Sequence, residues 1–255
     1  MSESLPTRKS PEGANELVAE IREKRKLLEE QHVVAVDMHI SSEERSVLDG
    51  FNIEKDSEQF DFYGETHEEL IAAAEQYLFE AGVNTSEDIT KIAQLVRRLA
   101  DGMRAGFETD SAWTMLRVSL PNTIFDVPRW HPDGRYFAGT EKSYKMVAAL
   151  KGPSTLFGQV TDEKAYKDLE KQNSENFDNF GTNRAKFNAE DARIREELSR
   201  VVTPIEIAKP GEAVIYLVGD PNAPLHSEPA IKVPRIFLSV LPGSFAQIEE
   251  WRARN

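Results

Sequence analysis

The chain has 255 residues, of which 40% are hydrophobic and 29% charged, a globular composition with room for one large domain. Its net charge of −13 argues against nucleic acid or an anionic membrane surface as a partner, because both need clustered Lys and Arg. It contains no cysteine, which excludes disulfides and thiolate chemistry, so that any metal must be bound through nitrogen and oxygen ligands. No apolar signal core or membrane-spanning run is present, and we expect a cytoplasmic protein.

The chain begins with a polar segment and a first helix. Residues 1–14 are rich in Ser, Pro and Gly and are predicted to form a flexible tail. Apolar residues at helical spacing predict a helix over 16–31, and VVAVDMHI at 33–40 predicts a short strand. A polar, acidic stretch follows, to about residue 65.

Two further helices are predicted before residue 111. Thr66 and Glu69 form a capping box, in which both side chains bind free backbone amides, and it opens a helix that Gly82 can end. Ser86 begins the next helix, which has acids in its first turn and bases later, as the helix dipole favours. Residues 15–110 are therefore expected to form a mostly helical layer.

After about residue 111, short segments rich in β-forming residues alternate with turn signals such as HPDG and GDPNAP. The expected strands are 112–120, 144–150, 203–208, 213–218 and 235–241. They predict a barrel or jelly-roll core over 111–243. Residues 161–200 are highly charged and helix-like, which indicates a helical insertion or lid, and 244–255 are expected to form a C-terminal helix. Residues 15–255 are thus expected to fold as one domain.

Two of the five histidines are candidates for a metal site. His131 and Asp133 form an H-x-D pair, and residues two apart in an extended segment point to the same side. His226, which follows a strand-like segment and a turn, would add a second imidazole. Two histidines and one carboxylate leave open positions on an octahedral ion, the arrangement that Fe(II) oxygenases use for cosubstrate and dioxygen. A turn histidine, a capping aspartate and a surface arginine remain the alternative interpretation.

Arg235 is a candidate for binding an anion. It lies nine residues after His226 in a strand-like apolar run, where Phe237 and Ser239 share its face. An arginine that points into an apolar barrel is unfavourable unless an anion pairs with it. Guanidinium binds a carboxylate through two parallel hydrogen bonds, and the Ser239 hydroxyl could add a third.

This pattern of H-x-D, a distant histidine and a following arginine resembles the Fe(II)/2-oxoglutarate-dependent oxygenase superfamily. The resemblance covers roughly residues 111–243 and implies a double-stranded β-helix, a relative of the jelly roll. It also implies that His131, Asp133 and His226 bind Fe(II). Arg235 would bind the distal carboxylate of the cosubstrate, 2-oxoglutarate.

The chain departs from the family pattern in two places. The family often has a serine two positions after the arginine, whereas Phe237 stands there and Ser239 lies four positions away. The gap of 95 residues between His131 and His226 is long, and the helical insertion accounts for it. Related halogenases have a small residue at the position of Asp133, so the carboxylate here implies hydroxylation or another oxygenase outcome.

Three more residues are candidates for contacts with a substrate. Arg117 and Lys145 lie in strand-like runs, and Tyr136 flanks the H-x-D pair. Either basic side chain could hold a substrate carboxylate, although such side chains often extend to solvent. We therefore expect a small-molecule substrate, such as an amino acid or a related polar metabolite, whose C–H bond is oxidised with dioxygen.

Two alternatives stay open at this point. The first is a cupin-like metalloenzyme that does not use 2-oxoglutarate, which the role of Arg235 would distinguish. The second is a non-catalytic metal- or ligand-binding domain, which a failure to bind Fe(II) would favour. The N-terminal helices could also form a homodimer interface.

Overall fold

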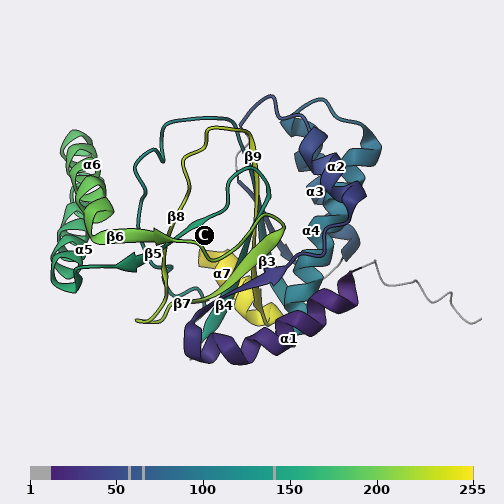
Figure 1. Ribbon diagram of the computed structural model, residues 1–255, viewed down its shortest axis with the longest axis horizontal. Coiled ribbons are helices and arrows are strands. Elements are labelled where there is room, and N and C mark those ends of the chain that lie inside the picture. The colour runs from purple at the N-terminus through teal and green to yellow at the C-terminus, as the bar shows by residue number, and fades with distance from the viewer. Residues whose placement is uncertain (1–12, 57–58, 65–66, 140–141, 255) are drawn as a thin grey trace, which may run out of the picture.

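A large antiparallel sheet forms the centre of this mixed α/β protein, seen in a computed structural model that describes residues 13–56, 59–64, 67–139 and 142–254 (Figure 1). The six strands of this sheet, in spatial order, are β1 (Val33–Asp37), β7 (Glu212–Val218), β4 (Ser143–Lys151), β9 (Arg235–Gly243), β3 (Ser111–Ser119) and β2 (Phe60–Gly64). All neighbouring pairs are antiparallel.

A second, three-stranded antiparallel sheet faces the large one. Its strands, in spatial order, are β6 (Val202–Ile205), β5 (Leu156–Val160) and β8 (Leu225–Ser227). From β4 to β9 the chain passes repeatedly between the two sheets. The ring of Phe157 on β5 meets the ring of Tyr216 on β7 edge-on, with centroids 5.4 Å apart, so the inner faces of the two sheets are in contact.

Four helices cover the other face of the large sheet. They are α1 (Ala14–Gln31), α2 (Ser42–Gly50), α3 (His67–Ala81) and α4 (Ser86–Phe107). Their apolar residues and those of the strands form one aliphatic core. Two glycines of α4 let α1 approach closely, because a Cβ on Gly102 would lie 2.5 Å from Leu17 and one on Gly106 would lie 2.3 Å from Ile21. Within the described ranges, no helix has the length and apolar character needed to cross a membrane.

Two antiparallel helices extend from the opposite end of the molecule, at the left of Figure 1. These are α5 (Glu163–Phe177) and α6 (Arg184–Val201), and they lie within the segment predicted to be a helical insertion. Leu169 of α5 and Leu198 of α6 share a small apolar cluster with Trp130 and Leu225. The hairpin is therefore attached to the segments that carry His131 and His226. The chain ends in α7 (Phe245–Arg254), as predicted.

Most of the predicted elements are confirmed, and two elements were missed in the polar stretch that ends near residue 65. One is α2, which begins with a capping box: Ser41 Oγ accepts from the backbone N–H of Glu44, and Glu44 Oε2 accepts from the backbone N–H of Ser41. The Ser-x-x-Glu signal was present in the sequence. The other is β2, which pairs with β3 at the sheet edge.

Other differences concern element ends and short strands. The strands β5 and β8 were not predicted, and β6 is shorter than the predicted strand at 203–208. Helix α4 begins at Ser86, as predicted, and Thr85 caps it, because the Thr85 side chain accepts from the backbone N–H of Asp88. Most of the predicted tail (1–12) and the capping residue Thr66 lie outside the described residues, while Ala14 already belongs to α1.

Candidate metal centre

The structure brings His131, Asp133 and His226 together, with one potential ligand atom of each within 4.8 Å of the others. The centroids of the two imidazole rings are 4.5 Å apart, and Asp133 Oδ1 lies 3.7 Å from Nε2 of His226. His131 belongs to the long connection between β3 and β4, and two backbone hydrogen bonds of 3.1 and 3.0 Å join it to His226 on β8. The two histidines are thus fixed relative to each other by the main chain.

Both histidines are held in a form that can bind a metal. Nδ1 of His131 lies 2.7 Å from the carbonyl oxygen of Arg129, so Nδ1 carries the proton and Nε2 keeps its lone pair. Burial lowers the pKa of His131. Burial also lowers the pKa of His226 to about 4, although Asp133 opposes the shift. Neutral imidazoles are therefore present at pH 7, as metal binding requires.

Asp133 is held by the large sheet through one of its two oxygens. Oδ2 accepts hydrogen bonds from Tyr216 Oη at 2.6 Å and from Lys145 Nζ at 3.0 Å. Lys145 and Tyr216 lie opposite each other on β4 and β7, which explains why they reach the same atom. Burial raises the pKa of Asp133, but Lys145, His226 and the Tyr216 hydrogen bond together bring it well below its usual range. The carboxylate is therefore ionised, with Oδ1 directed toward His226.

Arg235 is a buried cation with polar but uncharged contacts. Its side chain is 1% exposed, its Nε donates to the carbonyl oxygen of Pro153 at 2.9 Å, and its guanidinium carbon lies 4.5 Å from the centroid of the Phe237 ring. Among the residues that the structure describes, no carboxylate lies within ion-pair distance of it. Burial lowers the pKa of Arg235 to about 9, and Arg117 adds to the shift. A buried guanidinium in this setting favours an anionic ligand.

One cavity of about 240 Å³ connects these groups. The predicted site residues that line it are Arg117, His131, Asp133, Tyr136, Lys145, His226 and Arg235. Ser239 is buried on the cavity side of β9, between Met115 and Val147 of the adjacent strands, but does not line the cavity. A role for its hydroxyl in cosubstrate binding stays a prediction.

Lys145 is buried beside Asp133. Besides its ion pair with Asp133, it donates to Tyr136 Oη at 3.0 Å, and both Lys145 and Tyr136 are largely buried. Burial lowers the pKa of Lys145, but Asp133 and Tyr136 raise it above its ordinary value, so the ammonium is retained. The structure therefore joins these two predicted substrate contacts to the carboxylate of the metal-ligand cluster.

Sequence reasoning missed Tyr216 and Thr155 among the cavity residues. Tyr216 is fully buried, and a buried tyrosine hydroxyl normally has a hydrogen-bond partner, here Asp133. Its place in the strand-like run AVIYLV was visible in the sequence, but its partner was not. Arg129 reaches the cavity beside Glu228, with Nη2 3.0 Å from Glu228 Oε1.

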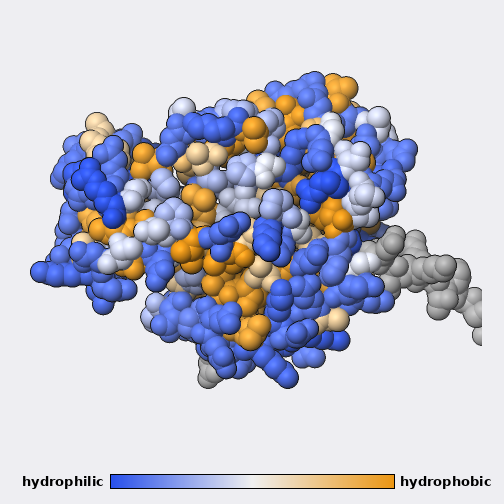
Figure 2. All heavy atoms as spheres, in the orientation of Figure 1, coloured by the Kyte–Doolittle hydropathy of each residue, from blue (hydrophilic) through white to orange (hydrophobic). Residues whose placement is uncertain are grey.

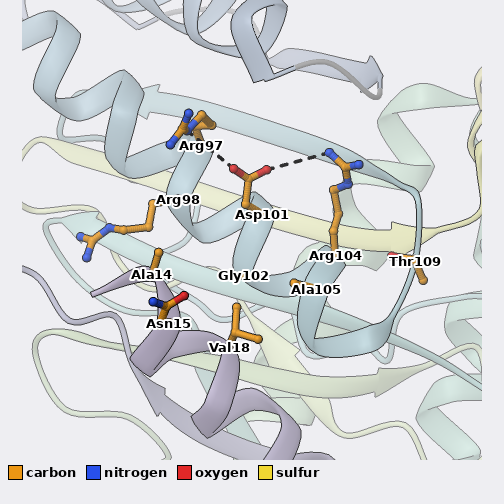
Figure 3. A pocket seen from close by; sticks show the side chains of 10 residues that line it. All are labelled: Ala14, Asn15, Val18, Arg97, Arg98, Asp101, Gly102, Arg104, Ala105 and Thr109. Atoms are coloured by element: carbon orange, nitrogen blue, oxygen red, sulfur yellow. Dashed lines mark ion pairs between the residues drawn. The ribbon is translucent and has the colours of Figure 1, made fainter. Parts of the chain in front are cut away.

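A larger pocket of about 360 Å³ lies between α1 and α4, away from these residues (Figure 3). Three of its charged side chains pair with one another: Arg97 lies 3.6 Å and Arg104 3.9 Å from the carboxylate oxygens of Asp101. No metal-ligand cluster like that of His131 was found there among the described residues. The smaller cavity, which combines three potential metal ligands with a buried arginine, is therefore the candidate site.

Comparisons with known proteins give weak likenesses only. No protein-family model matches the chain, and no curated protein sequence matches it. Among solved structures, a prolyl-4-hydroxylase from Pseudomonas putida is 13% identical, with 89% of this chain and 98% of that chain covered and a TM-score of 0.38. An oxidoreductase of the 2OG-Fe(II) oxygenase family from Burkholderia pseudomallei is 12% identical, with 94% of each chain covered and a TM-score of 0.37.

The Fe(II)/α-ketoglutarate-dependent dioxygenase TqaL is 11% identical, with 92% of this chain and 89% of that chain covered and a TM-score of 0.38. TM-scores below 0.5 carry no argument about the reaction of this chain.

Proposed function

We propose that this protein is an Fe(II)/2-oxoglutarate-dependent oxygenase that oxidises a C–H bond of a small molecule. The observation that carries the proposal is one cavity lined both by a two-histidine, one-carboxylate cluster and by a buried arginine. The ligand atoms fit Fe(II), because two neutral imidazoles and an ionised carboxylate are the donor set of non-haem iron oxygenases. Arg235 fits a carboxylate of the cosubstrate.

Each residue has a defined part in this proposal. His131, Asp133 and His226 would hold the metal, and Arg235 would hold the distal carboxylate of 2-oxoglutarate. The iron and the cosubstrate, when bound, supply the oxidising chemistry with dioxygen. The chain supplies orientation: Tyr216 and Lys145 fix the Asp133 carboxylate through Oδ2. Hydrogen bonds of this kind orient metal ligands and tune their basicity.

The proposed fold is a double-stranded β-helix within a single domain of residues 15–255. Two antiparallel sheets in contact, with a chain that passes repeatedly between them, support it. The proposal treats α1 to α4 as an outer helical layer and residues 161–200 as an insertion that covers the metal-bearing segment. The contact of Leu169 and Leu198 with Trp130 and Leu225 supports this place for the insertion.

The setting of Arg235 favours 2-oxoglutarate use over a cupin-like reaction without it. A cupin-like metalloenzyme would need only the metal ligands, and a guanidinium with 1% exposure on the same cavity would then be an unexplained destabilising feature. A carboxylate cosubstrate gives this cation its partner.

The test is an anaerobic titration of the purified protein with Fe(II) and then with 2-oxoglutarate, followed by visible absorption. We expect a weak charge-transfer band that needs both additions, and its absence in a His226→Ala variant. Bound iron without a band would overturn 2-oxoglutarate use and support the cupin-like alternative. No bound iron would overturn the metal site and support a binding domain.

A further inference from the structure

The cavity differs in charge from the rest of the protein. The chain has a net charge of −13, and hydrophilic side chains cover most of the face seen in Figure 2. The ionised groups that line the cavity are four cations and two carboxylates: Arg117, Arg129, Lys145, Arg235, Asp133 and Glu228. The charges of Fe(II) and of the 2-oxoglutarate dianion would cancel, so the cavity would keep an excess of positive charge that could bind a further ligand.

Arg117 accounts for much of this excess. In the described part of the chain its one ionic partner is Glu228, whose Oε1 lies 3.8 Å from Arg117 Nη2, which is beyond hydrogen-bond distance. The same Oε1 already accepts from Arg129 at 3.0 Å. Arginine has five N–H donors, and those of Arg117 have no hydrogen-bond acceptor among the described residues.

Arg117 and Arg235 occupy different depths beside the same ring. Arg117 pairs with Phe237 across β3 and β9, and its guanidinium carbon lies 5.8 Å from the Phe237 centroid, against 4.5 Å for Arg235. The Arg117 side chain is 29% exposed and that of Arg129 is 47% exposed, whereas Arg235 is 1% exposed. The cavity thus has a deep cationic position and a second one toward its mouth.

We propose that Arg117, with Arg129 beside it, binds a carboxylate of the primary substrate, which makes the substrate a small organic acid or amino acid rather than a neutral or cationic molecule. This inference rests on the proposed function, since it leaves the deep position, Arg235, to 2-oxoglutarate. Glu228 lies between Arg117 and Arg129 and holds the two guanidinium groups near each other. Because these two groups share one carboxylate, their remaining N–H groups can together bind a second carboxylate. The substrate then lies between the mouth and the metal ligands.

The experiment uses the full chain, loaded anaerobically with Fe(II) and 2-oxoglutarate. The probes are L-amino acids and short-chain carboxylic acids, each paired with its primary carboxamide, and binding is followed by the change in the charge-transfer band. We expect at least one acid to bind about tenfold more tightly than its amide, as a charge-assisted hydrogen-bond pair implies. Arg117→Met should remove this preference and leave 2-oxoglutarate affinity unchanged.

An Arg252→Met variant is the matched control, because that arginine is 61% exposed on α7 and does not line the cavity. It should keep the preference for the acid. The inference is overturned if no acid binds, if acids and amides bind equally, or if Arg117→Met weakens 2-oxoglutarate itself, which would assign Arg117 to the cosubstrate. A wild-type protein without the charge-transfer band would instead overturn the proposed function, so the two failures are distinguishable.

Discussion

The two faces of the large sheet are both buried, yet they differ in chemistry. On β9, Ile236, Leu238 and Val240 pack against the helices in an aliphatic core, whereas Arg235 and Phe237 face the cavity. All nine residues of this strand are buried. Residues that stabilise the fold and residues that form the site therefore alternate along one strand. Substitutions at neighbouring positions should affect either stability or ligand binding, which can be tested.

The largest effect is expected for His226→Ala on the cavity side. It removes an imidazole from the cluster, and since loss of an outer hydrogen-bond partner of a metal ligand already costs about 10–100-fold in affinity, Fe(II) affinity should fall by more than that. Equilibrium titration with Fe(II) measures the change. His32→Asn, at the C-cap of α1, is the control that should bind normally. Normal iron binding by His226→Ala would contradict the site.

Leu238→Ala tests the helix side of the same sheet. Leu238 has no exposed area and lies between Leu116 and Ala148 of the adjacent strands. The truncation leaves a cavity in a close-packed core, and we expect a loss of about 3 kcal/mol in the free energy of unfolding. Urea unfolding measures this loss. Iron affinity of the folded variant should not change, and a selective loss of iron binding would break the separation of the two faces.

Arg235→Met, three positions before Leu238 on β9, should lower ligand affinity without lowering the stability of the fold. Loss of the guanidinium should lower 2-oxoglutarate affinity about 100-fold, because truncation of one partner of a buried ion pair costs about 2–5 kcal/mol. Iron binding should remain. The unliganded protein should be no less stable, since the variant removes a buried cation that has no carboxylate partner in the described residues. Anaerobic titration and urea unfolding together check both statements.

Tyr216→Phe should have the smallest effect of the four. It removes the 2.6 Å hydrogen bond to Asp133 and keeps the ring in place. We expect iron affinity to fall about tenfold, with little change in unfolding. Tyr144→Phe is the matched control on the helix side of β4, where the Tyr144 ring packs against Phe107. Equal effects of the two variants on iron binding would show that Tyr216 does not position Asp133.

The separation of the two faces also explains what the sequence could predict. The candidate ligands His131, Asp133 and His226 were predicted because their residue types and spacing are unusual, and Arg235 because a charge interrupts an apolar run. The strand β8 was missed because three residues are too few for a periodic pattern. The alternation of residues along a strand predicts the face of the sheet on which each side chain lies, but it does not predict which residue that side chain contacts.

Lys145 shows this limit clearly. Its side chain lines the cavity, and the sequence interpretation gave it a substrate carboxylate as a possible partner. The structure pairs it with Asp133, which comes from a different segment, and its contact with a substrate stays a prediction. The same limit applies to Tyr216, whose hydroxyl has its partner 83 positions away in the chain. Such pairs depend on how the two sheets meet, which local sequence does not encode.

The pair of main-chain hydrogen bonds between His131 and His226 would have a consequence for how this protein acquires the proposed metal. Those bonds are made by main-chain N–H and C=O groups, none of which is a proposed metal ligand. In small zinc domains the ion itself organises the chain, and its removal unfolds them. Here folding and metal loading would be separate events, so that an ion could be lost and replaced in a chain that stays folded throughout.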